Sequence, residues 1–264
     1  EKSLIRNYIE RGTTQIIVGT HALIQKKMEF SNLGLIVVDE QHRFGVLQRD
    51  AISKKGLTPH VLIMTATPIP RSLALTLYGD MNISFLDEFP PGRMPIETKL
   101  FYENTRDTAY SLLEKEIKEG RQAYVVCPLI EESESIDLKA AIDVSDELKN
   151  RRLPNFKIQL IHGKLKKEER QKIMAEFKNG EIDVLVATTV IEVGIDVQNA
   201  TVMLIEHAER FGLAQLHQLR GRVGRGKHAS KCLLISSHAL TDDGKSRIIT
   251  IVKSRDGFSI AEED

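Results

Sequence analysis

The sequence predicts an α/β protein with parallel sheets divided between two domains. Short, continuous apolar segments rich in β-branched residues recur along the chain, which suits strands buried on both faces of a parallel sheet. Amphipathic segments with helical spacing alternate with them. Residues 87–95 interrupt the pattern, because three prolines and a glycine in six residues cannot continue a helix or a central strand. The length of 264 residues also suits two domains better than one core.

The first predicted domain, residues 1–93, carries three predicted strands at 15–19, 33–38 and 60–64. Small or polar residues follow each strand: Gly19-Thr20-His21, Asp39-Glu40 and Thr65-Ala66-Thr67. In open α/β folds, ligands bind at the edge where the carboxyl ends of parallel strands meet. These three loops are therefore candidate functional loops.

The second predicted domain, residues 94–264, restarts the series. Its predicted strands are residues 124–127, 157–161, 183–187, 202–205 and 232–235. Residues 165–178 predict a helix that places Ile173, Met174 and Phe177 on one face. Asn179-Gly180 is expected to end this helix, because glycine readily adopts the left-handed conformation of a helix C-terminus.

Composition limits the class of partner and the compartment. Lys plus Arg and Asp plus Glu are both 37, so any nucleic-acid contact must be local. Cys127 and Cys232 lie in apolar runs without metal-ligand spacing, which predicts buried free thiols in a reducing compartment. No apolar run approaches the roughly 20 residues of a membrane span. We expect a soluble, cytoplasmic protein, and the absence of an initiating Met predicts a piece of a longer chain.

Two charged clusters carry the predicted chemistry. Asp39 and Glu40 follow an apolar strand and can hold Mg²⁺ and orient a water, although an acidic pair there can also be only a helix start. Arg222 and Arg225 can stabilise a phosphoryl group in transfer, because a guanidinium stays charged and binds in a bidentate manner. Alternatively they form a solvated basic turn. Found in this order, with Thr65-Ala66-Thr67 between them, the two clusters predict an ATP-hydrolysing motor.

A phosphate-binding glycine loop is missing from the pattern. Asp243-Gly244-Lys245-Ser246 has part of its signature, but Ala239 stands where the spacing needs glycine, and no predicted strand leads directly into it. We therefore expect the first domain to begin after its phosphate loop.

The motifs together resemble the motor region of superfamily 2 helicases, most closely the RecG-type helicases of branched DNA, over essentially the whole chain. The resemblance rests on residues 19–21, 39–46, 65–71, 162–163, 187–196 and 218–225. Transcription-repair coupling factors share most of these motifs, but they typically carry Glu where this chain has Gln41. Residues 90–93 and 127–134 also fit the RecG type better. The resemblance implies two RecA-like lobes, the first of them incomplete.

Chemistry and resemblance together imply roles for individual residues. The expected catalytic residues are Asp39, Glu40, Gln218, Arg222 and Arg225, with Arg225 as the arginine finger. Asp39 would hold Mg²⁺ through its water shell, and Glu40 would polarise the attacking water. The expected ATP contacts are Asp39, Glu40, Asp196, Arg222 and Arg225. Gln41, His42, Thr65 and Thr67 would couple nucleotide state to motion. The expected DNA contacts are Thr20, His21, Arg43, Arg71, Thr188 and Thr189, while His162 fits either a DNA contact or a simple turn.

The sequence thus predicts an ATP-dependent DNA translocase that remodels forks and junctions and works as a monomer. One alternative is a transcription-coupled repair translocase. Another is a non-hydrolysing helicase-like interaction module, which the missing phosphate loop favours and the acidic pair and the arginines oppose. The acidic residues precede Pro90 and the arginines lie beyond Pro95, so we expect ATP to be used by closure of the two lobes.

Overall fold

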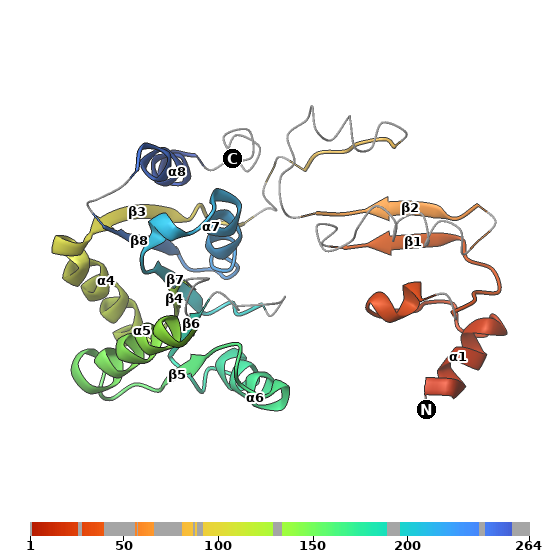
Figure 1. Cartoon of the computed structure of the whole chain (residues 1–264), viewed down its shortest axis with the longest axis horizontal. Coiled ribbons are helices and arrows are strands. Elements are labelled where there is room, and N and C mark those ends of the chain that lie inside the picture. Colours follow the sequence, from red (N-terminus) through yellow and green to blue (C-terminus); the bar gives the residue numbers. More distant parts are fainter. Residues whose placement is uncertain are drawn as a thin grey trace. The chain divides into compact units, whose positions relative to one another are not determined.

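The computed structural model describes residues 2–25, 28–39, 56, 58–65, 81–86, 88, 92–128, 134–188, 196–237 and 241–254. The chain divides into two compact units, residues 1–67 and 68–264. Each unit is described by itself (Figure 1). The predicted boundary after residue 93 stays a prediction, because most of residues 66–91 lie outside the described ranges.

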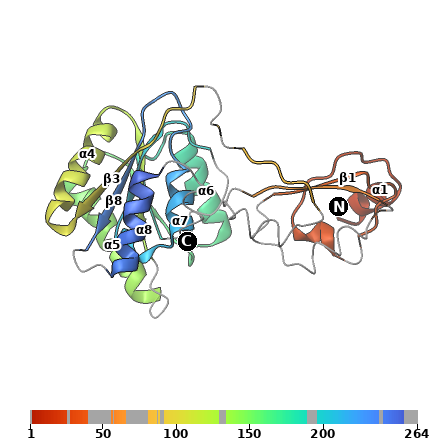
Figure 2. The ribbon, with the colours of Figure 1, turned by 90° about the horizontal axis from the view of Figure 1, so that it is seen from above.

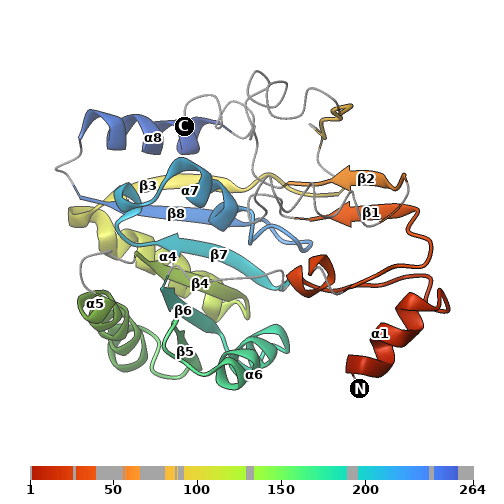
Figure 3. The ribbon, with the colours of Figure 1, turned by 45° about the vertical axis from the view of Figure 1, so that its right-hand side comes forward.

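The second unit is built on a six-stranded sheet in which all strands are parallel. Its order is β3-β8-β7-β4-β6-β5, which can be followed in Figure 3. The strands are β3 (Glu97–Tyr102), β4 (Gln122–Cys127), β5 (Ile158–Ile161), β6 (Val184–Thr188), β7 (Ala200–Ile205) and β8 (Lys231–Ser236). All five strands predicted for this domain are therefore confirmed.

Helices cover both faces of this sheet (Figure 2). One face packs against α4 (Arg106–Lys118) and α5 (Glu134–Glu147), which a π-helical turn, η4 (Leu148–Arg152), extends. The other face packs against α6 (Lys167–Lys178), α7 (Leu213–Arg220) and α8 (Asp242–Lys253). Short 3₁₀ turns, η3 (Glu103–Thr105) and η5 (Ala208–Arg210), follow β3 and β7. This two-sided cover explains why the central strands β4, β6 and β7 are buried along their whole length.

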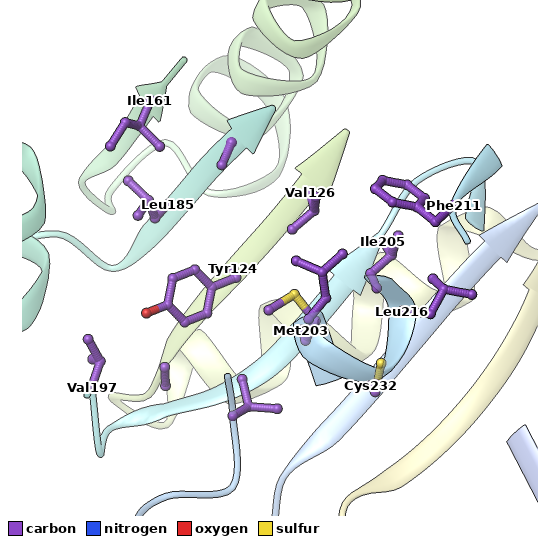
Figure 4. Close-up of a cluster of buried hydrophobic side chains, with 14 of the residues drawn as sticks. Tyr124, Val126, Ile161, Leu185, Val197, Met203, Ile205, Phe211, Leu216 and Cys232 are labelled. Atoms are coloured by element: carbon purple, nitrogen blue, oxygen red, sulfur yellow. The ribbon is translucent and has the colours of Figure 1, made fainter. Parts of the chain in front are cut away.

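The predicted helix over 165–178 is confirmed as α6. Ile173, Met174 and Phe177 are buried on its inner face, as the spacing predicts. The helix ends at Lys178 and is capped by Asn179, and Gly180 has a φ of +78°. Phe177 meets Tyr124 of β4 edge to face, with 4.9 Å between the ring centroids. Figure 4 shows the part of the core in which Tyr124 lies.

The strand β3 is an addition to the predicted series. Among the described residues it pairs with β8 alone, so it forms an edge of the sheet. Its first half, Glu97-Thr98-Lys99, is charged or polar, and most of its side chains are partly exposed. Such a strand lacks a continuous apolar run, because one exposed edge removes the need for full burial.

The first unit contains α1 (Lys2–Glu10), η1 (His21–Ile24) and the parallel pair β1 (Leu35–Val38) and β2 (His60–Ile63). Two predictions are wrong here. Residues 15–19 do not form a strand, and Ile16 and Val18 are 83% and 93% exposed. β1 and β2 are not buried on both faces, since Leu35 and Leu62 are 59% and 50% exposed. An apolar run becomes a buried strand only where a hydrogen-bonded neighbour and a covering layer exist, and the described part of this unit pairs β1 with β2 alone.

Candidate functional site

In the first unit, two predicted site residues lie at the same edge of the sheet. The register pairs Val38 with Ile63, and the amide of Met64 donates to the carbonyl of Val38 at 2.8 Å. Asp39 follows β1 directly, and Thr65 follows Met64 just past β2. Both side chains are exposed at the carboxyl ends of neighbouring parallel strands. The structure therefore brings the predicted metal-binding carboxylate and the predicted coupling threonine to one edge.

Thr20 and His21 lie at the start of η1. Thr20 is exposed and extended, with φ −100° and ψ −163°, and its carbonyl accepts from the amide of Leu23 at 3.0 Å. His21 is the first residue of that turn. The remaining predicted site residues of the first unit and two of the second unit lie outside the described residues: Glu40, Gln41, His42, Arg43, Thr67, Arg71 and Thr189.

In the second unit, the predicted arginines lie in a tight turn, residues 221–226, which we call the arginine turn. It begins at Gly221, which caps α7, and the amide of Arg222 donates to the carbonyl of Leu219 at 3.0 Å. Between the two arginines, Val223 is fully buried in the core. This buried valine anchors the turn, so Arg222 and Arg225 are presented from a rigid base.

Arg225 is held loosely at its charged end. Its Nε donates to the carbonyl of Gly221 at 3.2 Å, and its Nη1 lies 3.8 Å from Oδ1 of Asp196. The Arg225 side chain is 32% exposed and that of Asp196 is 51% exposed. The structure thus brings Asp196 and Arg225 together. A pair this long and this exposed leaves the guanidinium able to bind a stronger anion.

Two glycines allow the arginine turn to lie against its neighbours. Gly224 has a φ of +76°, and a Cβ there would lie 2.8 Å from Cγ1 of Ile96. At Gly226, a Cβ would lie 2.2 Å from the carbonyl oxygen of Gln198. Because Gln198 follows Asp196 by two residues, this approach of two backbones sets the spacing between Asp196 and Arg225.

Gln218 and Arg220 both lie on α7 but differ in exposure and in their contacts. Gln218 is partly exposed on α7, one turn before Arg222. Arg220 is only 6% exposed, and its Nη1 donates to the carbonyls of Ile251 and Ser254 at 2.8 and 2.9 Å, at the end of α8. Sequence reasoning did not assign Arg220. The helical spacing does indicate that Arg220 is buried, since it lies four residues after buried Leu216 and shares its face of the helix.

At the carboxyl edge of the six-stranded sheet lie Thr188, the last residue of β6, and His162, which follows β5. The register pairs Ile161 with Ala187, so the two residues are near neighbours. Thr188 is 1% exposed. Within the described part of the chain, the Thr188 hydroxyl and the Nδ1 of His162 are buried and have no hydrogen-bond partner. Buried polar atoms are normally satisfied, so this edge is a candidate for an external partner.

A second charged cluster lies on the α4 and α5 side, around Glu206 just past β7. We call it the Glu206 network. Glu206 is 5% exposed and accepts from Arg106 Nε at 2.8 Å and from the Tyr110 hydroxyl at 2.6 Å. Arg106 also donates to Glu147 at 3.1 Å and lies 4.4 Å from the centre of the Tyr110 ring. Burial alone would lower the pKa of Arg106, but Tyr110, Glu206 and Glu147 together raise it above its usual value. Every member is paired, so the network is structural.

The remaining sequence predictions concern cysteines, the glycine signature and metals. Cys127 and Cys232 are buried free thiols, as predicted, and burial raises the pKa of each to about 12. Gly244 lies in the first turn of α8, where its amide donates to the Thr241 hydroxyl at 3.2 Å, so it does not belong to a phosphate loop. Among the described residues, no group of three or more His, Cys, Asp or Glu could hold a metal ion. Nor does any helix in the described ranges have the length and apolar character needed to cross a bilayer.

Comparison with known proteins agrees with this geometry. The family described as DEAD/DEAH box helicase matches residues 1–76, and the family described as helicase conserved C-terminal domain matches residues 105–227. A Synechocystis protein named ATP-dependent DNA helicase RecG is 52% identical over 98% of this chain, which covers 31% of that protein. An Aquifex aeolicus protein of the same name is 51% identical over 100% of the chain and 34% of its own length.

A solved structure described as RecG bound to a three-way DNA junction matches 99% of this chain with a TM-score of 0.77 and 43% identity. This chain covers 34% of that protein. The match extends over both units, and the chain spans about a third of the length of the relatives it resembles. The chain belongs to the RecG-type helicases of superfamily 2, and its two units are parts of their RecA-like motor lobes.

Proposed function

We propose that the chain is part of the motor of an ATP-hydrolysing DNA helicase that remodels branched DNA. The names of the relatives and the junction-bound relative support this proposal. The observation that carries it is the arginine turn, in which Arg222 and Arg225 flank buried Val223 and Arg225 lies beside Asp196. Cationic side chains on a rigid base, with partial exposure, are suited to stabilising charge that develops on a phosphate.

The residues present fit ATP and Mg²⁺. Asp39, exposed at the end of β1, would hold Mg²⁺ through its water shell, and Glu40 would polarise the attacking water. Bound Mg²⁺ would neutralise charge on the phosphate oxygens. Arg225 would leave its long pair with Asp196 to contact the γ-phosphate, joined by Arg222 and Gln218. Asp196 would then be available to the ribose hydroxyls.

The same proposal assigns the DNA contacts to two groups of residues. They are Thr20, His21, Arg43 and Arg71 from the first part of the chain, and Thr188 and Thr189 from the second. Such contacts to phosphates carry no sequence information, which suits a motor that moves along DNA. The Thr188 hydroxyl, which is buried and has no partner in the described part of the chain, supports a partner arriving at that edge. Gln41, His42, Thr65 and Thr67 would link nucleotide state to the DNA grip.

ATP hydrolysis by the full-length protein, with and without a synthetic three-way junction, tests this function. We expect hydrolysis that the junction stimulates more than a linear duplex of equal length. Glu40→Gln should lower the rate by about 10²-fold while leaving ATP binding near normal, which is the usual scale for a positioned general base. A full-length protein that binds junctions but never hydrolyses ATP would instead be an interaction module.

The oligomeric state and the cellular location complete the proposal. We propose a monomeric motor, which light scattering of the full-length protein on a junction can test. We also propose a cytoplasmic location, which the buried free thiols support because unpaired cysteines are usual in reducing compartments. Fractionation of cells that express the tagged full-length protein tests the location.

A further inference from the structure

Ile96 contacts the arginine turn at Gly224. Ile96 is partly buried and packs against the core cluster that contains Val223. A Cβ on Gly224 would lie 2.8 Å from Cγ1 and 3.1 Å from Cδ1 of Ile96, and the next nearest atom is Cβ of Ser230 at 3.9 Å. The Ile96 side chain therefore occupies the space in which any other residue would carry its Cβ, against the backbone of the turn.

The pairing of β3 with β8 holds Ile96 in this place. The amide of Glu97 donates to the carbonyl of Ser230 at 2.9 Å, and the parallel pairing continues along the whole of β3. Figure 3 shows the two strands side by side. Ile96 precedes β3 and Leu100 lies within it, and both pack against the same core cluster, since residues four apart in an extended chain share a face. The Ile96 side chain is thus directed at the turn by a strand whose position is fixed.

The contact also lies where the predicted proline-rich linker, residues 87–95, ends. Pro95 precedes Ile96 and has no amide hydrogen to donate, and its ring restricts both its own φ and the conformation of the residue before it. Gly92 is exposed and has a φ of +84°. The chain therefore passes from an exposed turn through a stiff dipeptide to the residue that packs on the arginine turn.

Gly224 needs an outside contact because its own structure does not fix its backbone. A residue without a Cβ samples left-handed and other conformations freely, and Gly224 has a φ of +76°. Rotation of the backbone at this residue changes the direction of Arg225 relative to Arg222. Val223 anchors the preceding residue of the turn in the core, and Ile96 restricts the glycine itself.

We propose that Ile96 is a positioning residue, which holds the arginine turn in the conformation that presents Arg222 and Arg225 to a phosphate. The inference rests on the proposed function, because it needs the arginines to act on the nucleotide. Ile96 does not touch ATP, and it acts through its packing on Gly224. The residue that follows the linker thus supports the site, so that the arginines are preorganised before ATP is bound.

The test is Ile96→Ala in the full-length protein, with Leu100→Ala as the matched control. Leu100 packs against the same cluster, but the atoms nearest to the Cβ position of Gly224 belong to Ile96 and Ser230. We expect Ile96→Ala to lower the kcat of junction-stimulated ATP hydrolysis about 10-fold and to change KM for ATP less than about 3-fold. The loss stays below the roughly 100-fold cost of misplacing a catalytic group by about 1 Å, because Val223 still anchors the turn. Leu100→Ala should lower the melting temperature by a similar amount and leave kcat nearly unchanged.

Hydrogen exchange of the full-length protein measures the order of the turn without using its activity. The amide of Arg222 donates to the carbonyl of Leu219 at 3.0 Å, and it should exchange about 10-fold faster in Ile96→Ala than in Leu100→Ala. Ile96→Val removes only Cδ1 and should keep most of the kcat. If the alanine variant does not fold, exchange at Arg222 in the valine variant relative to the wild type decides instead: faster exchange supports the inference, and unchanged exchange overturns it.

Two outcomes overturn the role of Ile96 alone. One is a normal kcat in Ile96→Ala beside an inactive Arg225→Ala protein, and the other is an equal loss of kcat in Ile96→Ala and Leu100→Ala. Normal hydrolysis by Arg225→Ala overturns the proposed role of the arginine turn, and the role of Ile96 with it.

Discussion

The arginine turn and the Glu206 network use the same side-chain chemistry in opposite ways. In the network, Arg106 is paired with Glu206 at 2.8 Å and Glu147 at 3.1 Å and lies against the ring of Tyr110. In the turn, Arg225 reaches its carboxylate partner only at 3.8 Å, with its side chain 32% exposed. A saturated guanidinium stabilises the fold, whereas one with a weak partner can bind an anion from outside. The number and length of its pairs therefore distinguish a structural arginine from a functional one.

The first prediction separates the two regions by their effect on catalysis. Arg225→Ala in the full-length protein should reduce ATP hydrolysis by about 10³-fold or more, because an arginine finger acts mainly in the transition state. DNA affinity without nucleotide and the melting temperature should stay nearly unchanged. If DNA binding weakened in parallel with hydrolysis, Arg225 would be a contact to the DNA backbone.

The second prediction concerns stability at the Glu206 network. Arg106→Ala should destabilise the fold around α4 and β7 by about 3 kcal/mol, because it leaves a buried carboxylate without its charged partner. Native-state hydrogen exchange of the full-length protein measures this loss locally. Adding Glu206→Gln to Arg106→Ala should recover part of the stability. Lack of recovery would show that Arg106 matters for packing and not for charge.

The third prediction tests whether catalysis depends on the spacing between the arginine turn and Asp196. Gly226→Ala should cost about 2 kcal/mol, since its new methyl group would overlap a backbone oxygen that cannot easily move. It should also lower kcat, because the turn must shift relative to Asp196. Gly212→Ala is the control, as its Cβ would lie 3.7 Å from the nearest atom, the Gln215 Oε1, and its φ of −65° suits alanine. Equal kcat values for the two variants would contradict this account.

The smallest predicted effect is a pH dependence of stability, which comes from His207 and Glu209 just after Glu206. His207 Nδ1 lies 3.5 Å from Glu209 Oε1. Burial would raise the pKa of Glu209, but interactions with His207, the Glu209 backbone and Ser236 together outweigh it and lower the pKa from 4.5 to about 2. The hydrogen bond with Glu209 raises the pKa of His207 above 6.5.

The stability from the lowered Glu209 pKa is therefore present above pH 4.5 and is lost as the pH falls toward 2. The stability from the raised His207 pKa is present below pH 6.5 and is lost as the pH rises through the pKa of the folded state. The melting temperature of the wild type relative to Glu209→Gln should thus be highest between pH 4.5 and 6.5. A difference in melting temperature that is constant with pH would mean that the His207–Glu209 pair contributes nothing to the pH dependence of stability. His207→Asn should remove the upper limit of this window, because no group then titrates at that position, and asparagine tolerates the left-handed backbone there, with φ of +50°.

The two units also differ in how far sequence reasoning reached. In the second unit, continuous apolar runs became central strands covered on both faces, because helices follow the strands and bury them. In the first, equally apolar runs gave the exposed segment around Ile16 and a two-stranded sheet. Apolar character predicts that a segment seeks burial, but the neighbours that provide burial are not encoded within the segment.

The sequence by itself determined the α/β class, the central strands of the second unit and the pairing of acidic and arginine motifs that identifies the family. These features are local, since strand propensity, helical spacing and motif order are carried by a few neighbouring residues. Only the tertiary structure separated Arg220, buried and bound to the end of α8, from Arg222 and Arg225 in the same run. It alone brought Gly226 against Gln198. Those contacts join residues far apart in the chain, so their distances depend on how the whole sheet and its helices pack.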